Sequence, residues 1–369
     1  MGSLPPDTHR RPDDIPFWQA STMRESAGEE YSPPFIRWAG DTSPVARLLF
    51  LPEQILSVTS ATREIAYEAG RDYQADLATG EIRLPAGSRI PFKAETDLYP
   101  PMTSDLPKIA NRRGLPEVGL LFGEGDFYHR LQSEVTYTCA PGQWRGYVPA
   151  FAGDRLPRTM DKLQRREPVR LLLVGDSISE GYNASRLSNA PPFCPPYGEQ
   201  VAAGLERAYG GQVILENHAV AGWSSAQGLE QIRSERLADR RPDLVIIAFG
   251  MNDAWASDPA GFQGIIGRMM EEFCRVVLNS EESLPDFVLV APMLPNPEWH
   301  IPPDQFPAYR DALAALCGPG VVLADMTAVW TELLKRKTFW DVTGNGVNHP
   351  NDFGHRLYAQ TLLGLLVPR

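Results

Sequence analysis

The sequence predicts an α/β protein in which a three-layer αβα domain with five parallel strands follows an N-terminal β-sandwich. In the second half of the chain, near-continuous apolar runs alternate with amphipathic segments. This pattern is expected when parallel strands are buried on both faces and joined by helical crossovers. In the first half, short alternating runs are separated by proline and glycine, with no sustained helical period, which is typical of antiparallel strands.

Composition limits the classes of partner. The 369 residues suffice for two domains, and 43% apolar with 22% charged residues is ordinary for a globular protein. A net charge of -11 without a long block of like charge argues against nucleic acid and anionic membranes as partners. We therefore expect a small-molecule or polysaccharide substrate. The sequence specifies no oligomeric state.

The compartment is predicted from cysteines and apolar runs. The four cysteines lie far apart in the sequence, which favours free thiols over disulfides and fits a reducing compartment. No run approaches the roughly 18 apolar residues of a membrane span. The first residues contain no apolar core of a secretory signal, so the cytoplasm is the expected location, with secretion after signal removal as the alternative.

The first half divides into a tail, a β-rich domain and a connector. Residues 1–35 are rich in proline and charge, and we expect them to be irregular. Residues 36–160 form the predicted β-rich domain, with runs such as "ARLLFLP", "YQADLATGEIRLP" and "SEVTYTCAPGQW". Within the second run, "ATGE" is the expected hairpin turn. Residues 151–168 are polar and form the expected connector to the second domain, which spans residues 165–369.

The second domain alternates strands with helices. The predicted strands are residues 169–177, 212–220, 242–250, 285–293 and 321–327. Between the third and fourth, residues 262–278 repeat apolar side chains at helical spacing. Parallel strands joined by crossovers place their carboxyl ends at one edge of the sheet, which is where such sheets bind ligands.

Four chemically useful groups follow strands at that edge. Ser177 ends the first strand on the glycine turn of "GDSIS", and Asn252 ends the third in "GMND". Gly222, in "AVAGWSS", can bring a backbone N–H close to a ligand because it has no side chain. His349 follows the last strand, in "DVTGNGVNHPNDFGH". A nucleophile, a base and two oxyanion donors are the set that acyl transfer requires.

These four blocks resemble those of the SGNH (GDSL) hydrolase superfamily. The nucleophile block reads "VGDSISEG", with Ile178 where the motif usually has leucine. The glycine, asparagine and histidine blocks read "NHAVAGWSS", "FGMND" and "NHPNDFGH", in the order of the family. The resemblance covers about residues 169–369 and implies a flavodoxin-like three-layer domain.

The resemblance also implies a mechanism of ester hydrolysis through an acyl-enzyme. Ser177 is the implied nucleophile and His349 the implied general base. The backbone N–H groups of Ser177 and Gly222 and the amide of Asn252 are the implied oxyanion hole. No metal or other cofactor is expected.

The third member of the catalytic triad is missing from its usual place. The family acid stands three residues before the histidine, and that position is Gly346 here. We consider Asp341 and Asn345 as the partner of His349 and favour Asp341, with a backbone carbonyl or a Ser–His dyad as alternatives. In a well-studied triad, loss of the acid cost about 3 × 10⁴ in turnover, against about 2 × 10⁶ for the nucleophile. A dyad is therefore chemically tolerable.

Other chemistries are less well supported. His349, Asp352 and His355 form an H-x-x-D-x-x-H pattern, but no further histidine or cysteine cluster completes a metal site. Ser224 and Ser225 are weaker nucleophile candidates because they lack the strand-to-helix turn that follows a buried strand at Ser177. The sequence has no phosphate-binding loop and no dinucleotide fingerprint after a strand, so no nucleotide cofactor is expected.

The substrate is predicted only by class. Tyr182, Trp223, Trp299 and His300 are candidates to stack on a sugar ring or to line an acyl pocket. The β-rich domain joined to a hydrolase resembles the layout of two-domain carbohydrate esterases, which remove acetyl groups from polysaccharides. We therefore expect a short-chain carboxylesterase acting as a carbohydrate O-deacetylase. The alternatives are a lipid or thioester hydrolase and a carbohydrate-binding protein that has lost its activity.

Overall fold

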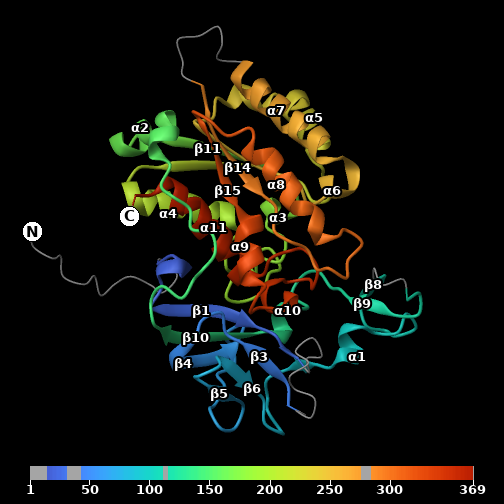
Figure 1. Ribbon diagram of the computed structural model, residues 1–369. Helices are drawn as coiled ribbons and strands as arrows, with labels where there is room; N and C mark the ends of the chain where they lie inside the picture. Colours follow the sequence, from blue (N-terminus) through green and yellow to red (C-terminus); the bar gives the residue numbers. More distant parts are fainter. Residues whose placement is uncertain (1–14, 31–42, 111–114, 276–283, 369) are drawn as a thin grey trace, which may run out of the picture.

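The computed structural model describes residues 15–30, 43–110, 115–275 and 284–368. Within these ranges the chain forms a β-rich N-terminal region and an α/β region, which lie one below the other in Figure 1. No helix in the described ranges is both long and apolar enough to cross a bilayer.

The α/β region is built on one sheet of five parallel strands, as predicted. Its strands are, in spatial order, β12 (Val213–Asn217), β11 (Val169–Gly175), β13 (Leu244–Ala248), β14 (Asp286–Ala291) and β15 (Val321–Asp325). The register pairs Leu173 with Asn217 on one side and with Ile246 on the other. β11, β12 and β13 end two or three residues before the predicted ends, because there the chain leaves the sheet to form the turns of the site.

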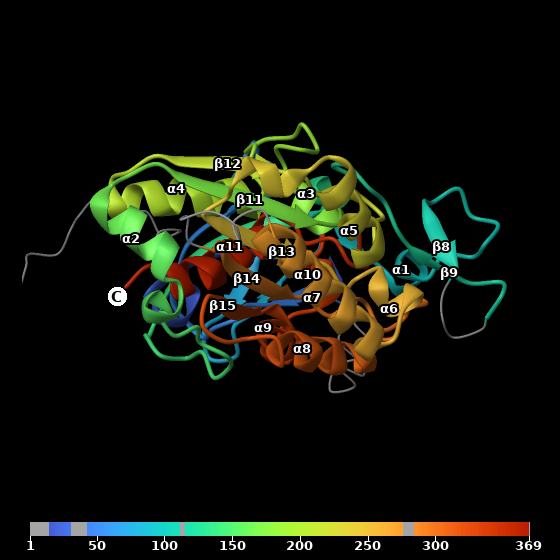
Figure 2. The same ribbon diagram turned by 90° about the horizontal axis from the view of Figure 1, so that it is seen from above.

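Helices cover both faces of this sheet and give the predicted three layers. Side chains of β11 alternate, with Leu171 and Leu173 in one apolar cluster and Leu172 and Val174 in the other. The first cluster includes residues of α2, α4, α9 and α11, and the second those of α5 and α7. Figure 2 shows α4 and α11 on one side of the sheet and α5 and α7 on the other.

The longer helices are α2 (Pro157–Arg165), α4 (Tyr197–Tyr209), α5 (Ser225–Ser234), α7 (Pro259–Arg275), α8 (Phe306–Ala314), α9 (Met326–Leu333) and α11 (Asp352–Leu366). The short helical turns are η2 (Phe17–Gln19), α1 (Glu95–Leu98), η4 (His129–Leu131), η5 (Gly153–Arg155), α3 (Ser177–Glu180), η6 (Leu237–Arg240), α6 (Asp253–Ala256), η7 (Pro303–Gln305) and α10 (Phe339–Val342). The helix predicted over 262–278 lies within α7, and its residues 276–278 are outside the described residues.

The N-terminal region consists of small sheets that are mainly antiparallel. One contains β1 (Thr22–Ala27), β10 (Ser133–Cys139) and β4 (Pro52–Ser60). A second contains β5 (Gln74–Asp76), β6 (Glu81–Arg83), β3 (Val45–Arg47), β2 (Glu29–Glu30) and β7 (Phe92–Lys93), and a third β8 (Lys108–Ala110) and β9 (Gly119–Leu121). The antiparallel, β-rich character is confirmed, as is the "ATGE" hairpin between β5 and β6. The sandwich arrangement stays a prediction.

The prediction that residues 1–35 are irregular is wrong for part of that segment. Residues 22–27 form β1, which pairs with β10 along its whole length. The prediction depended on the polar composition of this segment. Glu25 can nevertheless be buried in β1, because Lys337 from the α/β region neutralises its charge. Residues 1–14 and 31–35 lie outside the described residues.

The predicted connector is helical and packs against the sheet of the α/β region. Residues 153–165 form η5 and α2, and the backbone N–H of Thr159 donates to Asp286 at 2.7 Å. Arg158 pairs with the buried Asp243 at 2.9 Å. The polar side chains of this segment therefore bind the buried carboxylates at the amino ends of the strands.

A buried ion pair joins the two regions. Lys337 Nζ lies 2.9 Å from Glu25 Oε2, and both side chains are fully buried. Glu25 also accepts a hydrogen bond from the backbone N–H of Leu49 at 2.9 Å and one from the hydroxyl of Tyr137 at 2.5 Å. Lys337 additionally donates to the carbonyl of Arg47. A charge buried this completely is tolerated only because its partners replace water.

We predict that Lys337→Ala lowers the free energy of unfolding by about 3 kcal/mol, because it leaves the Glu25 carboxylate buried without its cation. Urea unfolding measures this change. Lys335→Ala is the matched control, because Lys335 pairs with Glu332 at the surface and its side chain is 63% exposed. Equal urea midpoints for Lys337→Ala and the wild type would contradict the prediction.

Candidate active site

Ser177 lies at the carboxyl end of β11 on a turn with little free space. A side chain at Gly175 would place its Cβ 2.7 Å from the carbonyl oxygen of Ala248, so the turn requires glycine. Asp176 caps α3 by accepting from the N–H of Ile178 at 3.0 Å. Burial raises the pKa of Asp176 to about 7. The capping contact and the burial of its side chain indicate a structural role for Asp176, next to Ser177.

The side chains of Ser177 and His349 are in hydrogen-bond contact. Ser177 Oγ lies 2.8 Å from His349 Nε2, and the two residues are only 5% and 8% exposed. The ring of Tyr182 stands edge-on to the imidazole, with the centroids 5.2 Å apart. Residues that the sequence separates by 172 positions therefore form the pair that the motif blocks predict.

Two oxygen acceptors face the other nitrogen of the imidazole. His349 Nδ1 lies 3.1 Å from Glu124 Oε1 and 3.2 Å from Asn183 Oδ1. The amide of Asn183 has a defined orientation because its Nδ2 donates to the carbonyls of Gly125 and Gly344. Nδ1 between two acceptors must carry the proton, so Nε2 presents its lone pair to Ser177 Oγ. This is the tautomer that a general base needs.

Asn345 fixes the loop that carries His349. Its Oδ1 accepts from the backbone N–H groups of Val347, Asn348 and His349 at 2.9 to 3.1 Å. Its Nδ2 donates to Glu124 Oε1 at 3.1 Å. The sequence suggested that Asn345 contacts the imidazole nitrogen. In the described structure Asn345 instead holds the backbone of His349 and the carboxylate of Glu124.

Asp341 has other partners than the predicted one. Its carboxylate accepts from the backbone N–H of Thr338 at 2.6 Å and from that of Gly28 at 2.9 Å. It also lies 3.7 Å from Lys337 Nζ. The expectation that Asp341 orients His349 is corrected, because this carboxylate caps α10 and binds the N-terminal region instead.

The predicted oxyanion residues lie on two adjoining turns. Gly222 follows β12 with a φ of +78°, a conformation that favours glycine, and apart from its chain neighbours no described residue lies within 4 Å of the position of a Cβ there. Asn252 follows β13, and its Nδ2 donates one hydrogen bond to the carbonyl of Trp223 at 2.9 Å. An amide nitrogen carries two N–H groups, so a second donor remains for a ligand. The contact also ties the turn of Gly222 to Asn252.

The competing serines have structural partners. Ser225 donates its hydroxyl to the buried Asp253, and the backbone N–H of Ser225 binds the same carboxylate at 3.0 Å. Ser224 caps α5 together with Gln227. Neither hydroxyl is in hydrogen-bond contact with His349 in the described structure.

The residues of the H-x-x-D-x-x-H pattern point to separate partners. His355 Nε2 contacts the carbonyl of Tyr182 at 3.0 Å, and Asp352 accepts from the N–H of Ser185 at 2.7 Å. His349 uses both of its nitrogens as described above. Among the described residues, no three His, Cys, Asp or Glu side chains are grouped so that they could hold a metal ion.

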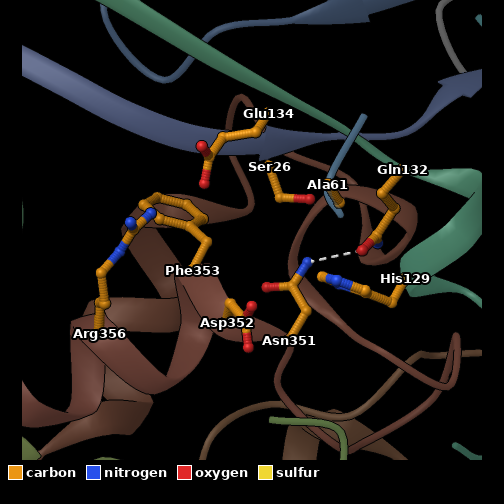
Figure 3. Close-up of a pocket in the computed structure, with 9 residues that line it drawn as sticks. All are labelled: Ser26, Ala61, His129, Gln132, Glu134, Asn351, Asp352, Phe353 and Arg356. Carbon is orange, nitrogen blue, oxygen red and sulfur yellow. Dashed lines mark hydrogen bonds between the residues drawn. The ribbon is translucent and has the colours of Figure 1, made fainter. Parts of the chain in front are cut away.

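A small polar pocket lies behind the His349 loop, between the two regions. Figure 3 shows residues of the N-terminal region, among them Ser26 and Gln132, facing residues of the first turns of α11. Asn351 Nδ2 donates to Gln132 Oε1 at 3.1 Å and to the carbonyl of Asp341 at 2.8 Å. Gln132 Nε2 in turn donates to the carbonyl of Thr343 at 2.9 Å. The N-terminal region thus contacts both ends of the loop that carries His349.

Comparison with known proteins identifies the family. A model of the GDSL-like lipase/acylhydrolase family matches residues 173–357, about half of the chain. The chain belongs to this family. As a member it is a carboxylic ester hydrolase, and the matched range includes Ser177, Gly222, Asn252 and His349. A search of curated proteins found no match.

Several solved structures are similar to part of this chain. A two-domain esterase (CEX) active on acetylated mannans is 23% identical, with 59% of this chain and 54% of that chain covered and a TM-score of 0.44. An Axe2 variant, an acetyl-xylooligosaccharide esterase from Geobacillus Stearmophilus, is 18% identical over 53% of this chain and 92% of that chain, at a TM-score of 0.43. The lipase Lip_vut3 from a goat rumen metagenome is 17% identical over 53% and 95%, also at 0.43. At TM-scores below 0.5 and identities below 25%, these likenesses carry no argument about this chain.

The sequence did not reveal the two residues that contact His349 Nδ1. Glu124 lies 225 positions before His349, in the N-terminal region, where no motif marks it. Asn183 lies six positions after Ser177, just beyond the nucleophile block. The one signal in the sequence is Gly346, because a glycine in the position of the family acid implies that another segment supplies the partner of the histidine.

We predict that Asn345→Ala lowers both stability and turnover. It removes the acceptor of three buried backbone N–H groups, each of which costs about 1 to 3 kcal/mol when it is left unsatisfied. Urea unfolding and initial rates of ester hydrolysis measure the two effects. Asn345→Asp is the matched variant, because it keeps the acceptor oxygen and is expected to retain more of the loop. Wild-type stability and turnover of Asn345→Ala would contradict the proposed function of this side chain in the loop.

Proposed function

We propose that the protein is a serine esterase that hydrolyses short-chain carboxylic esters, and acetyl esters of carbohydrates in particular, through an acyl-enzyme. The observation that carries this proposal is the 2.8 Å contact between Ser177 Oγ and His349 Nε2, made by an imidazole whose Nδ1 faces two acceptors. This arrangement leaves Nε2 as the acceptor of the serine proton.

The proposed reaction has two halves. Ser177 Oγ attacks the ester carbonyl while its proton passes to His349 Nε2, and the imidazolium then protonates the leaving alcohol. In the second half His349 takes a proton from water, the resulting hydroxide attacks the acyl-enzyme, and the proton returns to Ser177 as the acid leaves. In each half the negative oxygen receives hydrogen bonds from the backbone N–H groups of Ser177 and Gly222 and from the amide of Asn252.

An exposed aromatic cluster beside the site supports a carbohydrate substrate. Trp255 is 75% exposed and lies three residues after Asn252, on α6. The ring centroid of His300 lies 5.1 Å from that of Trp255 and 4.5 Å from that of Trp299. A large aromatic side chain this exposed beside further rings is a candidate contact for a ligand, and a flat ring with an apolar face suits a sugar.

The cluster is attached to the His349 loop as well as to Asn252. The segment that leads to Trp299 and His300 is held by Asn296, whose Nδ2 donates to the carbonyl of Gly346 at 2.9 Å. The backbone N–H of Asn296 donates to the carbonyl of Val347 at 2.8 Å. A sugar stacked on the cluster would therefore be positioned relative to both the oxyanion donor and the base.

The alternative of a binding protein without activity loses its support. It depended on the missing acid before His349, and the carboxylate of Glu124 lies 3.1 Å from His349 Nδ1. A lipid or thioester hydrolase is the other alternative, and acyl chain length distinguishes it: the proposed esterase prefers acetyl over octanoyl p-nitrophenyl esters.

We predict that Ser177→Ala reduces the turnover of p-nitrophenyl acetate by at least about 10⁴-fold, because removal of a serine nucleophile in a triad has cost about 10⁶-fold. Absorbance of released p-nitrophenol measures the rate. Ser234→Ala is the matched control, because the Ser234 hydroxyl donates to backbone carbonyls of α5 at the surface. If Ser177→Ala keeps the wild-type rate, Ser177 is not the nucleophile and the proposed mechanism fails.

We predict that Trp255→Ala raises KM for acetylated manno- or xylo-oligosaccharides about 3- to 10-fold, since one aromatic contact contributes about 0.5 to 1.5 kcal/mol. The KM for p-nitrophenyl acetate stays unchanged, because this substrate has no sugar to stack. Release of acetate and of p-nitrophenol measures the two reactions. An unchanged KM for both substrates would show that Trp255 does not contact the sugar.

A further inference from the structure

We infer that Glu124, supplied by the N-terminal β-rich region, is the positioning carboxylate of His349, so that the active site is assembled from both regions of the chain. This inference rests on the proposed function of Ser177 and His349. It assigns a role in the reaction to a region that the family match does not include.

The usual position of the acid is closed to any side chain. Gly346 has a φ of +81°, which L-residues rarely adopt, and a Cβ there would lie 2.4 Å from the hydroxyl oxygen of Tyr128 and 3.0 Å from the ring of Trp340. Tyr128 is buried, stacks on Trp340 with centroids 5.4 Å apart, and donates to the carbonyl of Leu121 at 2.8 Å. The N-terminal region thus fills the space that an acid at position 346 would need.

The same segment brings its own carboxylate to His349. Glu124 lies four residues before Tyr128, in the loop between β9 and η4. The next residue, Gly125, accepts hydrogen bonds on its carbonyl from Asn183 Nδ2 at 3.1 Å and from Ser188 Oγ at 3.0 Å. Because Gly125 and Tyr128, which both follow Glu124, are held by these contacts, the backbone next to Glu124 is held in place.

The carboxylate is bound on both of its oxygens. Oε1 lies 3.1 Å from His349 Nδ1 and accepts from Asn345 Nδ2 at 3.1 Å, and Oε2 lies 3.2 Å from His349 Nδ1. Partial burial opposes ionisation, but hydrogen bonds and charge from His349, with hydrogen bonds from Asn345 and Asn183, lower the pKa of Glu124 below its usual range. Glu124 is therefore an anion at neutral pH, next to the ring that becomes a cation during the reaction.

The two acceptors on Nδ1 have separable functions. Asn183 is neutral and fixes the tautomer of the imidazole, whereas Glu124 also stabilises the imidazolium that forms when Ser177 loses its proton. Loss of Glu124 alone therefore leaves the correct tautomer in place. The expected loss of turnover is smaller than the roughly 10⁴-fold seen when a triad acid is neutralised and the tautomer is wrong.

The test compares Glu124→Gln and Glu124→Ala with the wild type and with Asp126→Asn. Asp126 is the matched control, because it lies in the same loop but pairs with Arg130 at the surface. We expect both Glu124 variants to lower kcat for p-nitrophenyl acetate about 30- to 300-fold, with KM changed less than about threefold, because charge stabilisation of the transition state is lost while substrate contacts remain. Asp126→Asn should keep the wild-type kcat.

Chemical rescue provides a readout that a purely structural role would not give. The side chain of Glu124 is 36% exposed, so a small anion can reach its place in Glu124→Ala. Added formate should restore part of kcat in Glu124→Ala and none in Glu124→Gln, where the amide occupies the space. Introducing Gly346→Asp into Glu124→Ala should restore nothing, because Tyr128 fills the position of that side chain.

The outcomes separate this inference from the proposed function. Wild-type kcat in a folded Glu124→Gln protein, with Ser177→Ala inactive, would overturn the role of Glu124 and leave the esterase mechanism standing. An active Ser177→Ala protein would instead refute the mechanism itself. If Glu124→Ala fails to fold, as judged by circular dichroism, the near-isosteric Glu124→Gln still decides the question through kcat. Rescue of Glu124→Ala/Gly346→Asp would also overturn the inference.

Discussion

The geometry of the site depends on the clamping of one imidazole ring between a hydroxyl and two oxygen acceptors. His349 contacts Ser177 Oγ through Nε2, and Glu124 and Asn183 through Nδ1. A histidine in a loop between two helices has no regular backbone ladder to hold it. Here its backbone is held by Asn345 and its ring by the side chains of Ser177, Asn183 and Glu124. The ring therefore has one tautomer and one direction before any substrate arrives, which is what preorganised catalysis requires.

The clamp in turn requires the N-terminal region to sit on the α/β region in one register. Buried polar contacts specify that register: Lys337 pairs with Glu25, and the backbone N–H of Gly28 donates to Asp341. Such contacts add little net stability compared with apolar packing, but a displaced partner leaves a charge buried without compensation, which costs several kcal/mol. Polar side chains at this interface therefore favour one docking geometry over neighbouring ones. That docking geometry therefore also sets the position of the loop that carries Glu124.

Ordinary sheet geometry explains the other half of the site. β11, β12 and β13 are adjacent and parallel, so the turns that follow them, with Ser177, Gly222 and Asn252, meet at one edge. Gly175 permits the close approach of Ala248. Gly222 has a positive φ that other residues would adopt only with strain. These turns need only the α/β region, whereas the partner of His349 comes from outside it. The proposed nucleophile and oxyanion donors thus come from one region, whereas the proposed base is oriented by contacts from both regions.

The sequence by itself determined the parallel sheet and the order of its motif blocks, and it indicated Ser177, Gly222, Asn252 and His349 as the candidate site residues. It could do so because apolar runs and the residues that end them are local signals, and strand ends in a parallel sheet converge by rule. It also indicated, through Gly346, that the usual acid was absent. Tertiary structure alone brought Glu124 to His349 and gave Asp341 other partners, because contacts across 225 positions and between two regions leave no periodic or short-range trace in the chain. It likewise decided that residues 22–27 form a strand, since the charge that permits Glu25 to be buried lies on Lys337, at the other end of the sequence.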